Sequence, residues 1–488
     1  MTVHARFSSG LLQRIWHFSE LPQTPVSLRQ MCQFGPQPDP GVLFKASCFL
    51  VGELQVRLAR RIKELGAFPY GLNKMEDIIQ IRDWYVQSFK DLHDFSHDLK
   101  TRNGRLYQML YGDMQPEMLE EKELLRNVVQ LLYNESELKS PKEGQMALPK
   151  KARKYYSTLP SHIGYKNDMD EDQFYKFWPK DVLMFNQDYF KVLNKIKRRH
   201  DATVITMAKG LFKWKRTLQQ NVIDASVQDY LDRFYMSRIG IRMLIGQHLA
   251  LLQQGKQQQH STSAEDHELD KDYVGIICTK TSITELANDA IDRARYICAE
   301  HYGLYEAPKV ELLSFPLRKS TTKGNQPKEL SQDIEFMYVP GHLMHMLFET
   351  LKNALRATVE KILQENPDTK DKDSLVYPVV KVVISEGLED LTVKISDEGG
   401  GIARSNLPLV WTYLYTTMPT DEQARLIEED SLTYNCRAPI AGFGYGLALS
   451  RLYSRYFGGD LKLISMEGFG TDVYLHLNRL STSSEPLQ

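Results

Sequence analysis

The sequence predicts an α+β fold in which an all-helical domain, similar to a four-helix bundle, is followed by an α/β sandwich. Between residues 42 and 252 apolar side chains recur every three or four positions, and alternating β-branched runs are few. After Tyr273 the pattern changes to helices mixed with short alternating strands. A polar, glutamine-rich stretch at residues 254–272 separates the two patterns, and we place the domain boundary there.

The N-terminal domain is expected to span residues 19–253 and to contain about four main helices. Residues 185–218 and residues 227–252 each keep the helical spacing throughout, so each is predicted to form one helix. Residues 136–161 are rich in Lys, Pro and Ser, which predicts a loop or an insertion.

The C-terminal domain is expected to span residues 273–480, with residues 481–488 as a tail. A helix is predicted over residues 282–301, with Thr281 or Ser282 as its N-cap. Four alternating runs predict two β-hairpins, in the pairs 379–385 with 391–396 and 461–465 with 473–477. Antiparallel strands covered on one face by helices form an α/β sandwich, which differs from a doubly wound sheet.

Composition argues against several classes of protein. The 488 residues carry a formal net charge of −1, which does not favour a chain-wide electrostatic grip on nucleic acid or an anionic membrane. No apolar run approaches the roughly 18 residues that a membrane-spanning helix needs. The five cysteines are scattered without a CxxC pair, so no zinc site is expected, and the set is typical of a reducing compartment.

The first 18 residues differ in composition from the rest of the chain. Residues 1–18 contain two arginines and two serines, and acidic residues are absent before Glu20. On a helix, Phe7, Leu11 and Ile15 would share one face opposite a basic one. This composition is typical of a mitochondrial transit peptide, and the alternative is an ordinary frayed terminus.

A polar face is predicted on the helix that follows Pro340-Gly341. Six residues line or flank this face: His342, His345, Glu349, Lys352, Asn353 and Arg356. The carboxylate and the carboxamide could bind Mg²⁺ through oxygen, and the two cations could hold phosphate oxygens. A solvated helix face with i,i+4 ion pairs would show the same pattern, so the neighbouring motifs decide between the two interpretations.

Asp397 ends a predicted strand and is followed closely by the three glycines Gly399, Gly400 and Gly401. A carboxylate at a strand end can accept a hydrogen from an exocyclic amine such as that of adenine. Glycines let the backbone turn sharply and approach a flat ring. Without the other motifs, this pattern would more often mark a simple turn.

A glycine loop, Gly442-Phe443-Gly444-Tyr445-Gly446-Leu447, precedes a helical stretch at residues 448–456. Glycines before a helix N-terminus leave backbone N–H groups free for an anion, and the helix dipole assists. The loop lacks the preceding strand and the following acidic residue of a dinucleotide fold. Gly468-Phe469-Gly470-Thr471 closes the set, and the long polar stretch 411–440, with Thr416-Thr417 near its start, is predicted to form a lid.

In this order the motifs resemble the ATP-binding domain shared by histidine kinases, gyrase and Hsp90 chaperones, which is neither a P-loop nor a protein-kinase fold. Three further segments resemble the mitochondrial pyruvate dehydrogenase kinases: Tyr338-Val339-Pro340, residues 234–244 and residues 459–468. The resemblance runs from about Leu28 to Leu480, with insertions near 99–160 and 362–375.

The resemblance implies a role for each matching residue. Glu349 would be the general base for a substrate hydroxyl, His345 would orient or tune its carboxylate, and Asn353 would hold Mg²⁺. The remaining contacts to ATP would come from Lys352, Arg356, Asp397, Gly399, Gly401, Thr416, Thr417, Thr471 and the loop Gly442, Phe443, Gly444, Tyr445, Gly446 and Leu447.

The implied function is that of an ATP-dependent protein serine kinase of the mitochondrial matrix that inactivates the pyruvate dehydrogenase complex. Its expected partners are the pyruvate dehydrogenase alpha subunit as substrate, the lipoyl domain of the dihydrolipoamide acetyltransferase core, and a second copy of the chain. The apolar segment 43–65 of the helical domain is expected to contribute to lipoyl docking.

Other classes remain open at this point. A branched-chain 2-oxoacid dehydrogenase kinase is the alternative within the family, but Tyr445 and residues 450–457 favour the pyruvate enzyme. A histidine kinase would need a sensor segment and a phospho-accepting histidine, and a chaperone-type ATPase usually places its nucleotide domain first.

The sequence also departs from the family pattern at two places. His200-Asp201 matches a family site, but the sequel Ala202-Thr203 does not, so we interpret His200 as a core histidine. The sequence also lacks the Asp-Trp tail seen in many pyruvate dehydrogenase kinases, which argues against a tail-exchanged dimer and against tail-assisted docking on the lipoyl domain.

Overall fold

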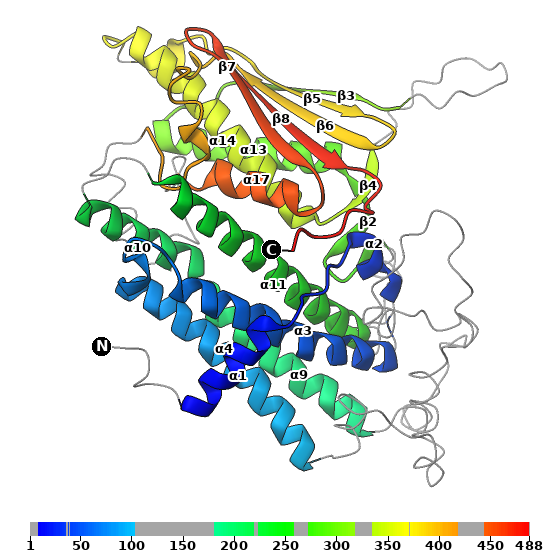
Figure 1. Cartoon of the computed structure of the whole chain (residues 1–488). Helices are drawn as coiled ribbons and strands as arrows, with labels where there is room; N and C mark the ends of the chain where they lie inside the picture. The colour runs from blue at the N-terminus through cyan, green and yellow to red at the C-terminus, as the bar shows by residue number, and fades with distance from the viewer. Residues whose placement is uncertain are drawn as a thin grey trace, which may run out of the picture.

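The computed structural model has a helical domain below and a sheet-and-helix domain above in the view of Figure 1. It describes residues 8–35, 38, 40–102, 180–218, 223–257, 272–317, 334–369, 371–417 and 444–487. The predicted insertion 136–161 lies outside these residues, as do most of the predicted linker and of the lid. None of the described helices is long and apolar enough to cross a membrane.

Long helices that pack side by side form the N-terminal domain. They are α1 (Ser9–Glu20), the short α2 (Leu28–Met31), α3 (Pro40–Gly66), α4 (Glu76–Arg102), α9 (Lys180–Arg199), α10 (Thr203–Thr217) and α11 (Ala225–Gln257). Their apolar side chains form one core, in which residues four apart on α3, such as Leu54 and Leu58, are at most 1% exposed. The predicted helical bundle is therefore confirmed.

Two predicted boundaries in this domain are wrong. The helix predicted over residues 185–218 is broken at His200, where the side chain and the N–H of Thr203 both donate to the carbonyl of His200. A buried histidine and a capping threonine thus separate α9 from α10. At the other end, α11 continues to Gln257, so the first residues assigned to the linker 254–272 are helical.

Helix α1 overlaps the segment predicted as a transit peptide. Ile15 is 3% exposed, and the Phe18 ring lies edge-on to Phe89 of α4 with the ring centroids 5.5 Å apart. Lys63 of α3 makes an ion pair of 2.6 Å with Glu20. Residues 9–20 are therefore packed against the bundle, whereas residues 1–7 lie outside the described part of the chain.

A mixed sheet forms the centre of the C-terminal domain. Its strand order is β3 (Val310–Phe315), β5 (Val380–Glu386), β6 (Asp390–Asp397), β8 (Gly470–Asn478) and β7 (Asp460–Met466). The two predicted hairpins are confirmed as β5–β6 and β7–β8. The edge strand β3, which pairs parallel with β5, was not predicted. A small second sheet joins β1 (Tyr273–Val274), β2 (Ile277–Ser282) and β4 (Glu335–Tyr338).

Three helices cover one face of this sheet: α13 (Ile283–Tyr302), α14 (Pro340–Glu365) and α17 (Gly446–Tyr456). Ser282 caps α13 by accepting a hydrogen bond from the Glu285 N–H, as the sequence predicts. Strand residues that alternate in burial, such as Val380, Val382 and Ile384, turn their buried side chains to these helices. The predicted sandwich is therefore confirmed.

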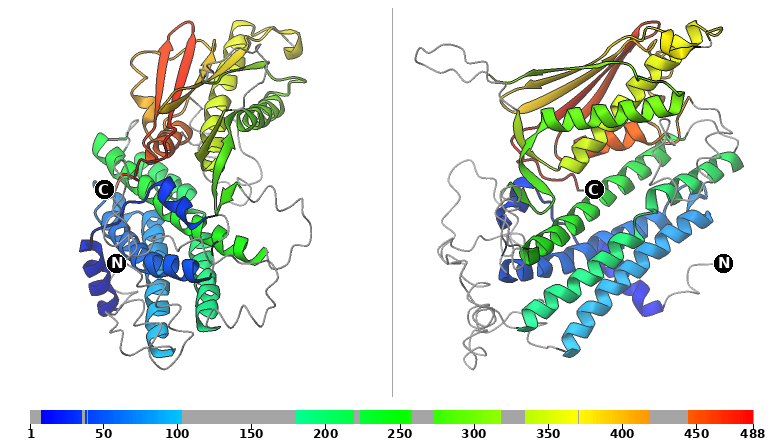
Figure 2. Two further views of the ribbon diagram at one scale, coloured as in Figure 1. Left: turned by 90° about the vertical axis from the view of Figure 1, so that its right-hand side faces the viewer. Right: turned by 180° about the vertical axis from the view of Figure 1, so that it is seen from behind.

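Helix α11 lies at the junction of the two domains (Figure 2). It packs against α3 and α9 of the bundle and against α17 of the C-terminal domain. Residues 481–487, predicted as a tail, return to the helical domain, where Ser484 pairs with Ser27 as an isolated antiparallel bridge. The two domains therefore share one continuous hydrophobic core.

Candidate functional site

Helix α14 presents the polar side chains expected of the site. It begins at Pro340, whose fixed φ and missing N–H suit the first turn of a helix. Leu347, Leu351 and Leu355 are at most 1% exposed, so they hold the opposite side of α14 in the core. This packing fixes the direction in which the polar face points.

Glu349 and Lys352 form an ion pair on this face. The Lys352 Nζ lies 2.9 Å from the Glu349 Oε1, and the two side chains are 4% and 17% exposed. The Lys352 ammonium also lies 5.1 Å from the centroid of the Phe348 ring. Lys352 therefore serves as the counter-ion of the carboxylate in this structure, whereas its predicted contact with nucleotide stays a prediction.

His345 lies one turn before Glu349 on α14, and its predicted role of orienting or tuning that carboxylate stays a prediction. Among the described residues no hydrogen bond joins it to Glu349, and its Nε2 is buried without a partner. The ring packs against Tyr453 of α17 with centroids 5.2 Å apart. Burial lowers the pKa of His345, so the ring is held neutral beside the Glu349–Lys352 pair. Lys352 is the ion-pair partner of the Glu349 carboxylate.

The N-terminus of α17 meets the Glu349 carboxylate. A side chain at Gly446, the first residue of α17, would clash with the Glu349 Oε2, so only glycine fits there. The side chain of the N-cap residue Tyr445 makes no capping hydrogen bond, and the first turn of the helix retains N–H groups without intrahelical acceptors. This end of α17 can therefore accept an anion, as the glycine loop predicts.

Gly444 lies in the same loop with φ +79°, and a Cβ there would approach the Tyr415 carbonyl oxygen to 2.5 Å. Both the backbone conformation and the space require glycine. Leu447 follows in the first turn of α17, whereas Gly442 and Phe443 lie outside the described residues.

The Tyr445 side chain lies in the core, and the predicted contact of this residue with phosphate stays a prediction. It is 5% exposed, and its ring lies 5.1 Å from that of Tyr413 and 5.8 Å from that of Tyr235 on α11. The Tyr413 hydroxyl donates to Asp232 of α11 at 2.7 Å. This aromatic cluster connects the glycine loop and the start of the lid to the helical domain.

The described part of the predicted lid begins at the 3₁₀ turn η6 (Leu409–Trp411). Arg356 of α14 donates to the Thr417 Oγ1 at 3.0 Å and forms an ion pair of 2.7 Å with Glu360. Thr416 lies beside Thr417 and is half-buried. The first residues of the lid are therefore tied to the helix that carries Glu349, and residues 418–443 lie outside the described structure.

Asp397 forms a second corner of the site at the end of β6. It is 6% exposed, and its Oδ1 accepts hydrogen bonds from the N–H of Gly399 at 2.9 Å and of Thr471 at 3.3 Å. Burial raises the pKa of Asp397 to about 6, although these backbone hydrogen bonds act in the opposite direction. Such a carboxylate can accept an amine hydrogen when it is ionised.

The glycines after Asp397 turn the chain between α14 and the β7–β8 hairpin. A Cβ at Gly399 would lie 2.5 Å from that of Ala357, and Gly401, at φ +72°, lies directly against the Met466 carbonyl. The Gly400 N–H donates to the Phe469 carbonyl at 3.0 Å. The Asp-x-Gly-Gly-Gly turn is therefore held by packing on both sides.

Ser465 supports this corner and was not predicted. Its Oγ lies 2.9 Å from the Thr471 Oγ1 and accepts the N–H of Ile402 at 2.7 Å. Its position opposite Thr471 in the β7–β8 register could have signalled the contact. The Asp232–Tyr413 link was missed because no local pattern relates residues that are so far apart in sequence.

Asn353 lies one turn after Glu349 and is exposed to solvent. A carboxamide oxygen at this place suits Mg²⁺, which takes few protein oxygens and keeps several waters. The described residues contain no ready-made cluster of three His, Cys, Asp or Glu side chains for a metal. The donor set therefore fits a metal that arrives with other oxygen ligands.

Two family profiles match the chain. Residues 25–278 match the profile described as mitochondrial branched-chain alpha-ketoacid dehydrogenase kinase. Residues 338–481 match the profile described as histidine kinase-, DNA gyrase B-, and HSP90-like ATPase. The second profile covers α14, Asp397, the glycine loop and Thr471, so these elements belong to an ATP-binding domain.

Curated relatives match almost the whole chain. A mitochondrial [pyruvate dehydrogenase (acetyl-transferring)] kinase of Schizosaccharomyces pombe is 38% identical over 484 residues, covering 98% of both chains. A kinase of the same name from Arabidopsis thaliana is 35% identical, covering 99% of this chain and 97% of its own length. The mitochondrial [pyruvate dehydrogenase (acetyl-transferring)] kinase isozyme 3 of Homo sapiens is 30% identical, and the match covers 97% of this chain and 87% of the human one.

Proposed function

The chain belongs to the family of mitochondrial pyruvate dehydrogenase and branched-chain 2-oxoacid dehydrogenase kinases, and we propose that it is an ATP-dependent protein serine kinase that phosphorylates and inactivates the pyruvate dehydrogenase complex. One structural observation carries the proposal. The Glu349 carboxylate, the N-terminus of α17 and the Arg356–Thr417 contact meet at one edge of the ATP-binding domain. A proton acceptor thus lies beside an anion-binding helix end.

The side chains divide the work of phosphoryl transfer. Bound ATP supplies the phosphoryl group, and Mg²⁺ neutralises part of its charge. Glu349 accepts the proton of the substrate hydroxyl, and Lys352 holds its carboxylate in place through their ion pair. Asp397 and Thr471 recognise adenine, and the N–H groups at the start of α17 hold phosphate. Asn353, exposed one turn beyond Glu349, is the proposed Mg²⁺ ligand.

Identifying the residue that receives the phosphoryl group tests whether the chain is a serine kinase or a histidine kinase. The chain would be incubated with radiolabelled Mg-ATP and the pyruvate dehydrogenase alpha subunit, and the product would be exposed to acid and to base. Phosphoserine survives acid, whereas phosphohistidine loses its label. Acid-labile label on the product would refute a serine kinase.

The branched-chain complex is a second candidate substrate, because the profile that matches residues 25–278 is described by that name. The relatives that match the whole chain are named for pyruvate dehydrogenase, and they favour the first candidate. Parallel assays with both purified complexes separate the two substrates.

The proposed docking partner is the lipoyl domain of the dihydrolipoamide acetyltransferase core. Most apolar side chains of residues 43–65, including Phe44 and Leu54, are buried in the bundle, so they do not form an open groove. Family membership supports this proposal. Binding of the full chain would be compared for lipoylated and unlipoylated domain at low and high salt. Equal binding of both forms would contradict it.

A homodimer is proposed through the sheet face that α13, α14 and α17 leave uncovered. On this face Ile464 and Met466 of β7 are 59% and 61% exposed. Burying such side chains favours self-association. Light scattering should give twice the mass of one chain, and Ile464→Lys should reduce it. A monomeric mass for the unaltered chain would exclude the dimer.

The family is mitochondrial, and we propose the matrix as the compartment. A cleaved leader, as the composition of residues 1–18 predicts, would have to end before α1, because Ile15 and Phe18 are packed against the bundle. N-terminal sequencing of the protein recovered from mitochondria would locate the cut, and a mature chain that starts after Phe18 would contradict this account.

A further inference from the structure

Residues 481–487 lie across the junction of the two domains. The Ser481 carbonyl accepts the Arg29 N–H at 3.3 Å, and the Ser481 Oγ donates to the Met337 carbonyl of β4 at 3.1 Å. The Glu485 N–H donates to the Val26 carbonyl at 3.2 Å. This segment therefore bonds to the N-terminal part of the chain and to the ATP-binding domain at once.

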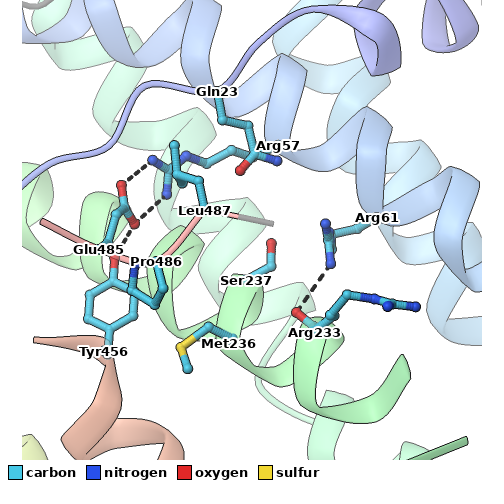
Figure 3. Close-up of a pocket in the computed structure, with 10 residues that line it drawn as sticks. All are labelled: Gln23, Arg57, Arg61, Arg233, Met236, Ser237, Tyr456, Glu485, Pro486 and Leu487. Carbon is cyan, nitrogen blue, oxygen red and sulfur yellow. Dashed lines mark hydrogen bonds and ion pairs between the residues drawn. The ribbon is translucent and has the colours of Figure 1, made fainter. Parts of the chain in front are cut away.

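The Glu485 side chain ends in a buried polar cluster (Figure 3). It is 4% exposed, and both carboxylate oxygens accept from the guanidinium of Arg57 on α3, which is 2% exposed. The Glu485 Oε2 also accepts the hydroxyl hydrogen of Tyr456, the last residue of α17. A buried charge with this number of partners is fixed in position.

Helix α11 makes room for this cluster through Gly240. A Cβ there would lie 2.9 Å from the Arg57 Nη1, 3.0 Å from the Glu485 Oε2 and 3.1 Å from the Tyr456 Oη. Glycine is unfavourable in the interior of a helix, so its presence is explained by this close approach. Elements α3, α11 and α17 and the C-terminal segment therefore meet at one point.

Helix α17 connects this point with the phosphate end of the site. Its last residue, Tyr456, bonds to Glu485, and its first, Gly446, lies against the Glu349 carboxylate. Between them Tyr453 packs on His345. A helix of 11 residues moves as a rigid unit, so a shift at one end displaces the other.

We propose that Glu485 is a positioning residue for nucleotide binding: through Tyr456 it fixes α17, and thereby the glycine loop, against the helical domain. This inference rests on the proposed kinase function for its relevance to catalysis. Glu485 does not touch the reacting groups, so its loss changes nucleotide affinity more than the rate of transfer at saturating ATP.

Two variants test the proposal. Glu485→Gln weakens the cluster, whereas Tyr456→Phe keeps the Arg57–Glu485 pair and cuts only its link to α17. In calorimetry both should raise the Kd of ADP by about five- to tenfold, a shift typical of coupled sites. The KM for ATP should rise equally, and kcat should change by less than about twofold. Glu389→Gln, at an exposed carboxylate outside the Arg57–Glu485–Tyr456 cluster, is the control and should leave ADP affinity unchanged.

Thermal unfolding separates positioning from simple stabilisation. If Glu485 only stabilised the fold, Glu485→Gln would have a lower melting temperature, but both variants would bind ADP with wild-type affinity. That result would overturn the proposal. Combining the two substitutions should weaken ADP binding no more than either alone, because both cut one link; additive losses also overturn it. ADP binding needs no protein substrate, so a chain that binds ADP normally but inactivates no dehydrogenase refutes the proposed function and not this inference.

Discussion

The two glutamates at opposite ends of α17 are held in different ways. Glu349, beside Gly446, has one charged partner in the described structure, Lys352, and its side chain is 17% exposed. Glu485, beside Tyr456, is bonded by Arg57, by a tyrosine hydroxyl and by the Val26 N–H, and its side chain is 2% exposed. The first carboxylate keeps access to solvent and free acceptor capacity, whereas the second has neither.

This difference indicates which carboxylate can do chemistry. A substrate must be able to reach the carboxylate that accepts its proton, and at least one position on the carboxylate oxygens must be free of other hydrogen bonds. A carboxylate that is buried and fully bonded instead fixes the elements that bond it. Both are charged residues with cationic partners, so charge alone does not separate a catalytic role from a positioning role. The number of partners and the exposure separate them.

The largest effect is expected from introducing a side chain into the glycine loop at the start of α17. Gly444→Val should reduce ADP binding below detection, because φ is +79° there and a Cβ would approach the Tyr415 carbonyl oxygen. Calorimetry measures the binding, and circular dichroism checks that the helical domain is folded.

The matched control is Gly303→Val. Gly303 also has a positive φ, +65°, but a Cβ there meets no atom within 4 Å, and the residue is the C-cap of α13. This variant should lose stability and keep ADP affinity. Normal ADP binding by Gly444→Val would show that the loop is not the phosphate site.

Removing the base should affect transfer rather than binding. Glu349→Gln keeps the shape of the side chain but loses its negative charge, so phosphoryl transfer should fall by on the order of 10²-fold or more. The affinity for ADP should change little, which is the opposite of the outcome expected for Glu485→Gln. Single-turnover kinetics measure the rate. Undiminished transfer would remove Glu349 from the mechanism.

The adenine corner should show a pH dependence. The pKa of Asp397 is raised from 3.8 to about 6, and the ionised form is needed to accept the amine hydrogen. ADP affinity should therefore be roughly constant above pH 7 and weaken about tenfold from pH 7 to pH 5. Calorimetry across this range measures the effect, and a flat profile would contradict the role of Asp397.

The same shift predicts a change in the stability of the nucleotide-free protein. Between pH 3.8 and about 6 the folded state binds more protons than the unfolded state, so stability falls as the pH rises through this window. The loss is about 3 kcal/mol in order of magnitude. Asp397→Asn should flatten this part of the denaturation profile, and an unchanged profile would show that another group titrates.

The smallest effects are expected in α11, where two glycines six residues apart can be compared. Gly240→Ala would crowd the Arg57–Glu485–Tyr456 cluster and should destabilise the fold by about 1–3 kcal/mol. Gly246→Ala meets only Ile276, at 3.5 Å, and should stabilise the helix by about 0.5–1 kcal/mol. Urea unfolding measures both, and equal effects would contradict the close packing at Gly240.

Local signals in the sequence predicted much of the fold and of the site. Both hairpins, the Ser282 cap and the polar face of α14 follow from periodicity, turn residues and capping, which involve neighbours in the chain. The glycines at Gly444 and Gly446 were recognised for the same reason, because the loop and the following helix are adjacent.

Contacts between distant segments were not predictable in this way. The break at His200 depends on a ring stacked on Tyr85 of α4 at 4.4 Å, and burial there lowers the pKa of His200 to about 3. Nothing near Tyr445 in sequence indicates that its ring packs in a cluster with Tyr235 and Tyr413. Glu485 was assigned to a tail, because nothing near it in sequence indicates its pairing with Arg57.

The central claim is that the chain is a protein kinase that inactivates the pyruvate dehydrogenase complex. The most direct test incubates the full chain with Mg-ATP and each purified complex, pyruvate and branched-chain, and follows dehydrogenase activity over time, with Glu349→Gln as the control. We predict that the pyruvate complex loses activity only with the unaltered chain, while the branched-chain complex keeps it. A pyruvate complex that stays fully active while serine phosphate is absent, or equal inactivation by Glu349→Gln, would contradict the account.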